Sequence, residues 1–188
     1  MNLVELTIQV HALLEQAGIT HAFGGALSLA YVADPRGTAD IDVNAFVGAD
    51  RIGEVVDALA ELGAEHEQPL DAWNPSAGLR LRTRDGLFPI DVFVSLDQRY
   101  DEIARRRVLH PFGPDHVPLP FLSVEDLVVF KLSFGRDKDW VDLRAIARSV
   151  EHLDLAYIER QLLGLRGSSM HPRLTRLRRL VREAEAGA

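Results

Sequence analysis

The segment from residue 20 to residue 47 constrains the fold most, because two apolar stretches flank a glycine pair and a short helical pattern. We expect a short strand over 20–23, followed by a turn at Gly24-Gly25 into a helix over 26–32. The Asp-Pro-Arg-Gly sequence at 34–37 should end that helix before a second strand over 39–47. Strand, turn, helix and strand in this order predict a sheet with helices packed against it.

The rest of the chain predicts more strands and then mainly helices. Asp50 is expected to cap a helix that ends at Gly63, and 78–94 is expected to form a hairpin. The proline-rich segment 107–121 should be a loop or a short irregular hairpin. Helices are expected over 124–134, 137–149, 155–163 and 173–185. The fold class is therefore α+β, with a mixed-sheet core over 1–121 and a helical C-terminal part over 122–188 packed on it.

Charge and composition exclude several functions. The net charge is -7, but residues 160–188 carry seven Arg against two Glu, so a basic tail of +5 follows an acidic body of -12. Cysteine is absent, which excludes disulfides and thiolate metal sites. The seven histidines show no two-His-plus-carboxylate spacing, which argues against a zinc hydrolase. Without a signal peptide or a long apolar stretch, a cytoplasmic protein that has no membrane partner is expected.

Asp40 and Asp42 form the first candidate site. Residues two apart on a strand face the same way, so these carboxylates should lie about 6 to 7 Å apart while Ile41 and Val43 enter the core. Such a pair can hold Mg²⁺, which prefers oxygen ligands. The alternative is a solvated pair of aspartates at a strand end.

Asp91 lies within the apolar run 90–94, where an unpartnered charge would be costly to bury. If its strand neighbours the strand of Asp40 and Asp42, three carboxylates could hold two cations about 3.5 to 4 Å apart. An edge-strand or salt-bridged aspartate is the other interpretation. Gly24-Gly25, between a strand and a helix, could bring backbone N–H groups close to phosphate oxygens, or could be a simple tight turn.

These residues together resemble a known family. The pattern Gly24-Gly25, Arg36, Thr38, Asp40-Ile41-Asp42 and then Asp91 resembles the polymerase-β-like nucleotidyltransferase superfamily. Segment 131–143 is similar to the Lys, Arg and Asp-X-X-Asp signature of AbiEii-type nucleotidyltransferases, the toxins of type IV toxin-antitoxin and abortive-infection systems. MenT-type toxins, which add nucleotides to tRNA acceptor ends, are also similar. Many relatives have Gly-Ser in place of Gly24-Gly25, so a serine contact to the triphosphate would be missing here.

The resemblance implies a site for Mg²⁺, or Mn²⁺ in its place, and for a nucleoside triphosphate as substrate. Metal binding would fall to Asp40, Asp42 and Asp91, and Asp91 would also help to deprotonate an acceptor hydroxyl. Contacts to the nucleotide are implied for Gly24, Gly25, Arg36, Thr38, Lys131, Arg136 and Asp139. Asp142, with or without Asp139, would orient Lys131 or contact the nucleotide.

The residues of the second motif also have plainer interpretations. Lys131 could be a snorkelling surface lysine, and Asp139 and Asp142 could belong to a surface ion-pair network. On the helix over 173–185, Leu and Arg residues occupy opposite sides, which suits a docked terminal helix as well as an RNA-binding strip.

From the resemblance and the basic tail we expect transfer of a nucleotide to the 3′ end of tRNA by a toxin with a cognate antitoxin partner. A small-molecule antibiotic or a protein side chain as acceptor, or a noncatalytic nucleotide-binding module, is the alternative.

Overall fold

A mixed sheet of seven strands organises the described residues of this computed structural model, which are 1–35, 37–66, 68–84 and 86–187. The strands are β1 His21–Phe23, β2 Ile41–Gly48, β3 Glu65–His66, β4 Leu79–Arg82, β5 Ile90–Ser95, β6 Val108–Phe112 and β7 Val117–Phe121. Their order is β3-β4-β5-β2-β1-β7-β6. The pairs β1/β7 and β2/β5 are parallel and the others antiparallel.

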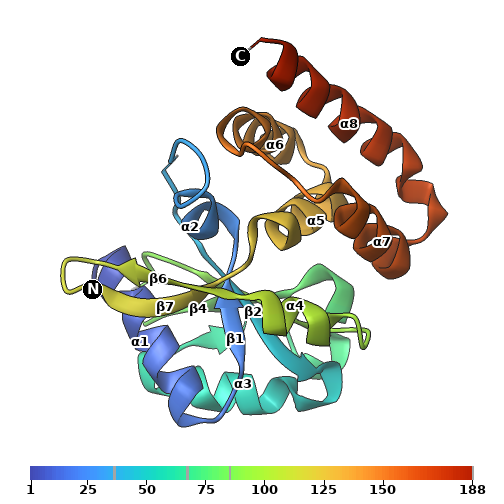
Figure 1. Cartoon of the computed structure of the whole chain (residues 1–188). Helices are drawn as coiled ribbons and strands as arrows, with labels where there is room; N and C mark the ends of the chain where they lie inside the picture. Colours follow the sequence, from blue (N-terminus) through green and yellow to red (C-terminus); the bar gives the residue numbers. More distant parts are fainter. Residues whose placement is uncertain (36, 67, 85, 188) are drawn as a thin grey trace.

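Within the same described ranges, the helices cover both faces of the sheet and form the C-terminal third. They are α1 Leu3–Gln16, α2 Gly25–Leu29, α3 Ile52–Leu59, α4 Tyr100–Arg106, α5 Val124–Phe134, α6 Asp137–Ser149, α7 Leu155–Arg166 and α8 His171–Ala186. Figure 1 shows α1 and α3 on one side of the sheet, and α5 to α8 stacked on the other. The α+β class with a helical C-terminal part, predicted from the sequence, is confirmed. Among the described residues, no helix is both long and apolar enough to cross a membrane.

Each face of the sheet buries its own hydrophobic cluster. Alternate residues of β2, Ile41 and Val43, join the cluster formed with α1 and α3. On the opposite face, Ala22 of β1 packs with the apolar residues of α4 to α8. Asp42, which alternates with Ile41 and Val43, therefore points toward the face that α5 and α6 cover.

Local sequence signals account for the ends of several helices. Asn2 and Glu5 form a capping box at the start of α1, and the Ser123 side chain accepts a hydrogen bond from the Asp126 N–H at the start of α5. Gly63 and Gly135 end their helices in the left-handed conformation, where glycine carries no Cβ penalty. The predicted ranges 124–134 and 137–149 agree with α5 and α6.

One local prediction was wrong and another is settled between its alternatives. Asp50 does not cap α3, because it lies within a 3₁₀ turn, Ala49–Arg51, that leads into the helix. The proline-rich segment forms a short hairpin of β6 and β7, as one of the two predicted alternatives, but its antiparallel pairing is regular. The hairpin tolerates Pro118 and Pro120 because β7 pairs with β1 only at Phe121, so the missing N–H groups lie outside that ladder.

Candidate active site

The three predicted carboxylates meet at one edge of the sheet. Asp42 of β2 lies directly opposite Asp91 of β5 in the parallel register, and Asp40 comes just before β2. Residues paired in this way point to the same side of a sheet. The structure therefore brings Asp91 next to Asp40 and Asp42, from which it is separated by about 50 residues in the sequence.

Burial and the two neighbouring carboxylates perturb Asp42. Burial, together with the negative charges of Asp40 and Asp91, raises the pKa of Asp42 from its ordinary 3.8 to about 6. Lys138 and Lys131 act in the opposite direction without cancelling the effect. A cluster of this kind gains from a divalent cation, and its all-oxygen donor set is the one that Mg²⁺ and Mn²⁺ prefer.

Arg80, on β4, contacts two of these carboxylates. Its guanidinium donates from Nε to Asp91 Oδ1 and from Nη2 to Asp91 Oδ2, each at 2.7 Å. Nη2 also lies 3.9 Å from Asp40 Oδ2. Arg80 was not among the site residues that the sequence predicted. The alternation of β4 indicated which side Arg80 faces, but only the β4–β5 register sets it opposite Asp91.

The glycine pair lies against Asp42. The Gly24 N–H donates to the Asp42 carbonyl oxygen at 2.9 Å, so this glycine links β1 to β2 at the turn. Gly25 has a φ of 54°, and a Cβ at this position would overlap the Asp42 carboxylate. The site therefore requires glycine at residue 25, both for its backbone conformation and for the close approach of the carboxylate.

Thr38 and Arg36 precede the carboxylates in the sequence. The Thr38 hydroxyl donates to Asp40 Oδ1 at 2.7 Å, which orients that carboxylate. Its predicted contact with the nucleotide stays a prediction. Arg36 lies outside the described residues.

Segment 131–143, the second predicted motif, forms two ion pairs. Lys131 of α5 donates from Nζ to Asp142 Oδ2 of α6 at 2.6 Å, and both side chains are at least 95 % buried. Arg136 pairs with Asp139, at 2.9 Å from Nε to Oδ2. The sequence left open which aspartate orients Lys131, and the structure identifies Asp142. Lys131 is not a surface lysine, because it is buried.

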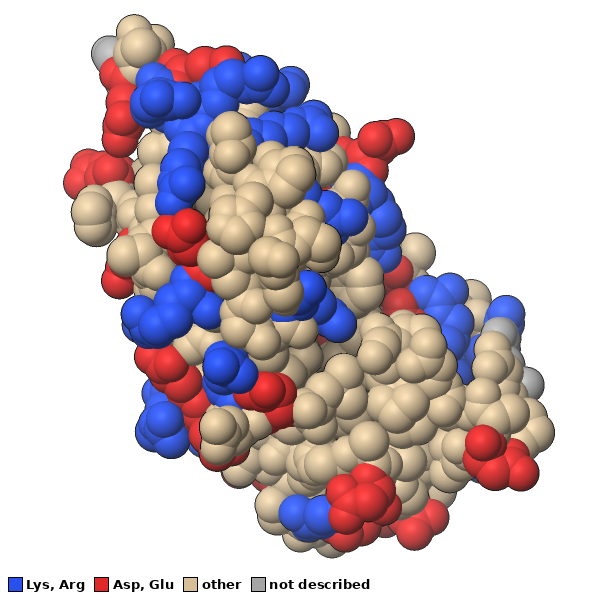
Figure 2. All heavy atoms as spheres, turned by 90° about the vertical axis from the view of Figure 1, so that its right-hand side faces the viewer, with Lys and Arg blue, Asp and Glu red and all other residues tan. Residues whose placement is uncertain are grey.

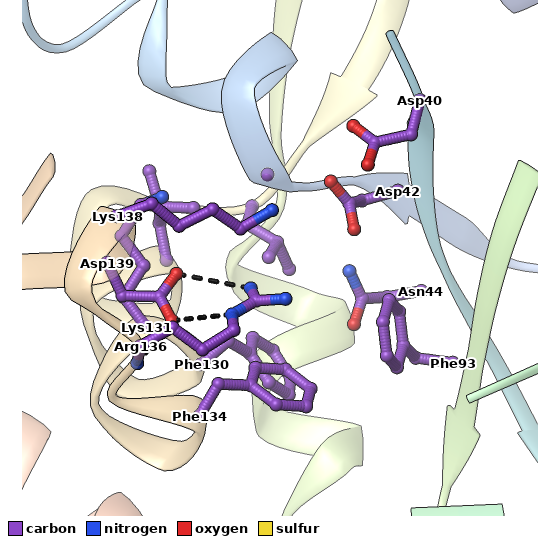
Figure 3. Close-up of a pocket in the computed structure, with 13 residues that line it drawn as sticks. Asp40, Asp42, Asn44, Phe93, Phe130, Lys131, Phe134, Arg136, Lys138 and Asp139 are labelled. Atoms are coloured by element: carbon purple, nitrogen blue, oxygen red, sulfur yellow. Dashed lines mark hydrogen bonds and ion pairs between the residues drawn. The ribbon is translucent and has the colours of Figure 1, made fainter. Parts of the chain in front are cut away.

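A pocket separates these two groups of charges. Figure 3 shows Asp40, Asp42, Asn44 and Phe93 on the sheet side, with the side chains of Arg136 and Lys138 extending toward them. Lys131 and Asp139 line the pocket on the same side as Arg136 and Lys138. The pocket is completed by Gly25 and by the apolar side chains of Leu122, Leu127, Phe130 and Phe134. One cleft thus has an anionic side, a cationic side and an apolar wall.

Sequence reasoning missed several residues of this pocket. Asn44 follows Asp42 at the spacing of a strand face, so the pattern Asp40-X-Asp42-X-Asn44 could have indicated it. Lys138 was not predicted as a site residue, but its side chain extends toward Asp40 and Asp42. The aromatic residues gave no signal, because apolar residues on α5 and β5 fit an ordinary core equally well.

The chain shares its fold with solved nucleotidyltransferases, all of them at or below 20% identity, so the predicted fold is confirmed. No protein-family model and no curated protein matches the chain. The antibiotic-resistance factor ANT(2″)-Ia is similar over 98% of this chain and 93% of its own, with 20% identity and a TM-score of 0.50.

Two further solved structures are similar. The lincomycin-bound lincosamide antibiotic adenylyltransferase LnuA covers 76% of this chain and 94% of its own, with 15% identity and a TM-score of 0.51. MenT4, a nucleotidyltransferase toxin from Mycobacterium tuberculosis H37Rv, covers 85% of this chain and 61% of its own, with 18% identity and a TM-score of 0.52.

Proposed function

We propose that this protein is a divalent-metal-dependent nucleotidyltransferase, which moves a nucleotide from a nucleoside triphosphate to an acceptor hydroxyl. The observation that carries the proposal is one pocket lined by Asp40 and Asp42 and by Lys131, Arg136 and Lys138. Asp91 lies next to this pocket, because it is the register partner of Asp42. The carboxylates are suited to cations and the opposite side to phosphates. The fold shared with nucleotidyltransferases supports the same conclusion.

The metal would be held by Asp40, Asp42 and Asp91, and a bound Mg²⁺ or Mn²⁺ would neutralise negative charge on the phosphates. Arg80 donates a hydrogen bond to each oxygen of Asp91. At least one of these hydrogen bonds breaks before Asp91 takes up a proton. Asp91 then accepts the proton of the acceptor hydroxyl. The acceptor oxygen bonds to the α-phosphorus, the bond from that phosphorus to the bridging oxygen breaks, and pyrophosphate leaves with the electron pair.

The remaining pocket residues position the nucleotide. Lys131, held by Asp142, and Arg136, held by Asp139, present positive charge to the triphosphate without free rotation of their side chains. Lys138 adds a third cation on the same side of the pocket. Gly25 lets the Asp42 carboxylate lie against the backbone beside the pocket. Phe130 and Phe134 offer an apolar surface for the base or the acceptor.

For the acceptor we propose RNA, specifically the 3′ end of tRNA, with the protein acting as the toxin of a toxin-antitoxin pair. The support is the basic strip of α8, formed by Arg176, Arg178, Arg179 and Arg182. Figure 2 shows Lys and Arg gathered where the C-terminal helices lie, with Asp and Glu among them. Part of this charge has partners within the protein: Arg178 pairs with Glu159 at 2.7 Å, and Arg176 lies over the Trp140 ring.

A small polyhydroxyl molecule is the second candidate acceptor. The support is the fold shared with ANT(2″)-Ia, which has been solved in complex with adenylyl-2″-tobramycin and is similar with a TM-score of 0.52.

To test for nucleotide transfer, the purified protein is incubated with nucleoside triphosphates labelled at the α-phosphate. The acceptor is either total tRNA or a panel of aminoglycosides and lincosamides. Expected are pyrophosphate release that depends on Mg²⁺ or Mn²⁺ and a labelled acceptor. Asp42→Asn should lower the rate at least about 100-fold, because several kcal/mol of charge stabilisation is lost. Asp57→Asn, on the exposed side of α3, is the matched control and should leave the rate unchanged.

An Asp42→Asn protein with the wild-type rate would refute the proposed mechanism. Nucleotide binding without pyrophosphate release would identify a binding module. For the RNA acceptor, replacing the four α8 arginines by Ala should reduce tRNA labelling and its dependence on salt. An unchanged rate on tRNA would exclude α8 as the RNA contact, and labelling of an antibiotic alone would identify the second candidate.

A further inference from the structure

Two histidines and a glutamate meet on the side of the sheet opposite the carboxylate cleft. His11 and Glu15 are one turn apart on α1, and His21 is the first residue of β1. His21 pairs with Ala45 of β2, which belongs to the cluster beneath α1 and α3, so its ring points away from the face of Asp42. It also lies at the end of β1 that is farther from Gly24. This cluster is therefore separate from the proposed nucleotide site.

The three side chains lie at the spacing of metal ligands. One ligand atom from each residue can be chosen so that all lie within 4.8 Å of one another. His11 Nδ1 and His21 Nε2 are 3.0 Å apart. Two imidazole nitrogens bound to a tetrahedral Zn²⁺ at about 2.05 Å lie about 3.3 Å apart. A shift of a few tenths of an ångström would place both nitrogens at that separation.

The hydrogen bond on the other side of His21 orients it as a ligand. His21 Nδ1 lies 2.9 Å from the Ile19 carbonyl oxygen. Since a carbonyl only accepts, Nδ1 carries the hydrogen and Nε2 presents a lone pair to His11. Metal-binding histidines commonly donate their second ring N–H to a carbonyl or carboxylate in this way. His11 can place its own proton on Nε2, which leaves Nδ1 available as the second ligand.

Charge and solvent access also fit a bound cation. Burial lowers the pKa of His21 to about 4 and also lowers the pKa of His11. Glu15, 61 % exposed, supplies a negative charge and lies 3.9 Å from His21 Nδ1. Arg107 opposes a cation here, since its positive charge reaches His21.

We propose that His11, Glu15 and His21 form a transition-metal site with two nitrogen ligands and one carboxylate, best suited to Zn²⁺. Solvent reaches the site from the exposed side of Glu15, so water can take the fourth position. Because the ligands come from α1 and β1, the metal would fasten the first helix to the sheet across the turn at 17–20. The sequence showed no spacing of two histidines and a carboxylate, whereas the structure brings His11, Glu15 and His21 together.

The test measures Zn²⁺ and Co²⁺ binding by protein that carries no histidine tag, in a millimolar excess of Mg²⁺. The Mg²⁺ occupies the all-oxygen site and competes poorly for histidine. Expected are one Zn²⁺ per chain and visible absorption of Co²⁺ in tetrahedral geometry. At 100 times the dissociation constant, Zn²⁺ should raise the Tm by about 5 to 10 °C.

Three variants decide the assignment. His11→Ala should abolish the Co²⁺ spectrum and the Zn²⁺-dependent rise in Tm, and Glu15→Gln should weaken Zn²⁺ binding at least about 10-fold. His152→Ala, at an exposed position between α6 and α7, is the control and should bind as the wild type does. Absence of Zn²⁺ uptake by the wild type, or unchanged affinity in Glu15→Gln, overturns the proposal. Glu15 is exposed, so this variant remains informative if His11→Ala does not fold.

Discussion

Replacing Asp42 by Asn should abolish activity and at the same time stabilise the protein. The substitution keeps the size of the side chain and removes its charge. The pKa of Asp42 is raised from 3.8 to about 6 by burial and by Asp40 and Asp91, so its ionisation opposes folding when no cation is bound. At about 1.4 kcal/mol for each pH unit, removal of this charge should stabilise the metal-free protein by about 3 kcal/mol above pH 7.

The pH dependence of the stabilisation shows whether the ionisation of Asp42 causes it. A carboxyl group whose pKa is raised by folding destabilises the protein. The effect grows as the pH rises from the pKa of the group in the unfolded state through its pKa in the folded state. The gain from Asp42→Asn should therefore be about 3 kcal/mol at pH 7.5, about half of that at pH 5, and close to zero below pH 4. In thermal unfolding, the gain at pH 7.5 corresponds to a Tm about 6 to 12 °C higher.

Urea unfolding of the wild type and of Asp42→Asn, with all divalent cations chelated, provides the measurement. Addition of Mg²⁺ should stabilise the wild type and narrow the difference, because the cation binds the folded carboxylate cluster. A gain of the same size at pH 4 and pH 7.5 would mean that packing, and not the ionisation of Asp42, is responsible. A variant less stable than the wild type at pH 7.5 would refute the electrostatic reasoning.

Two further variants test the glycine turn and the buried ion pair. Gly25→Ala should abolish transfer and lower the free energy of unfolding by about 1 to 3 kcal/mol, because its φ is positive and its Cβ would overlap Asp42. Gly86→Ala, which has a φ of 65° but open space around it, is the control, and activity retained in Gly25→Ala would contradict the requirement. Lys131→Met should cost about 3 to 5 kcal/mol, measured by urea unfolding, because the buried Asp142 carboxylate loses the cation with which it forms an ion pair. Adding Asp142→Leu should recover most of that loss, and no recovery would show that the pair is not the cause.

Much of the fold follows from the sequence because its signals are local. The cap at Ser123, the left-handed glycine at Gly135 and the apolar spacing between them predict α5 without reference to the rest of the chain. The same holds for the alternation that places Asp40 and Asp42 on one side of a strand. The β6–β7 hairpin was not predicted as regular, because prolines usually interrupt the pairing of strands. They are tolerated here because β1 pairs with β7 only at Phe121, which the sequence does not reveal.

The sequence by itself determined which residues can carry the chemistry: the glycine turn, three carboxylates in or beside apolar strands, and a lysine followed by two aspartates. The tertiary structure alone decided which of them meet. Alternation along a strand tells which face a side chain occupies, but not which strand lies next to it. That choice follows from the burial of the two hydrophobic faces of the sheet, which sets β2 beside β5 and thereby Asp42 opposite Asp91. The same packing pairs Lys131 with Asp142, places Arg80 against Asp91, and brings His21 to His11.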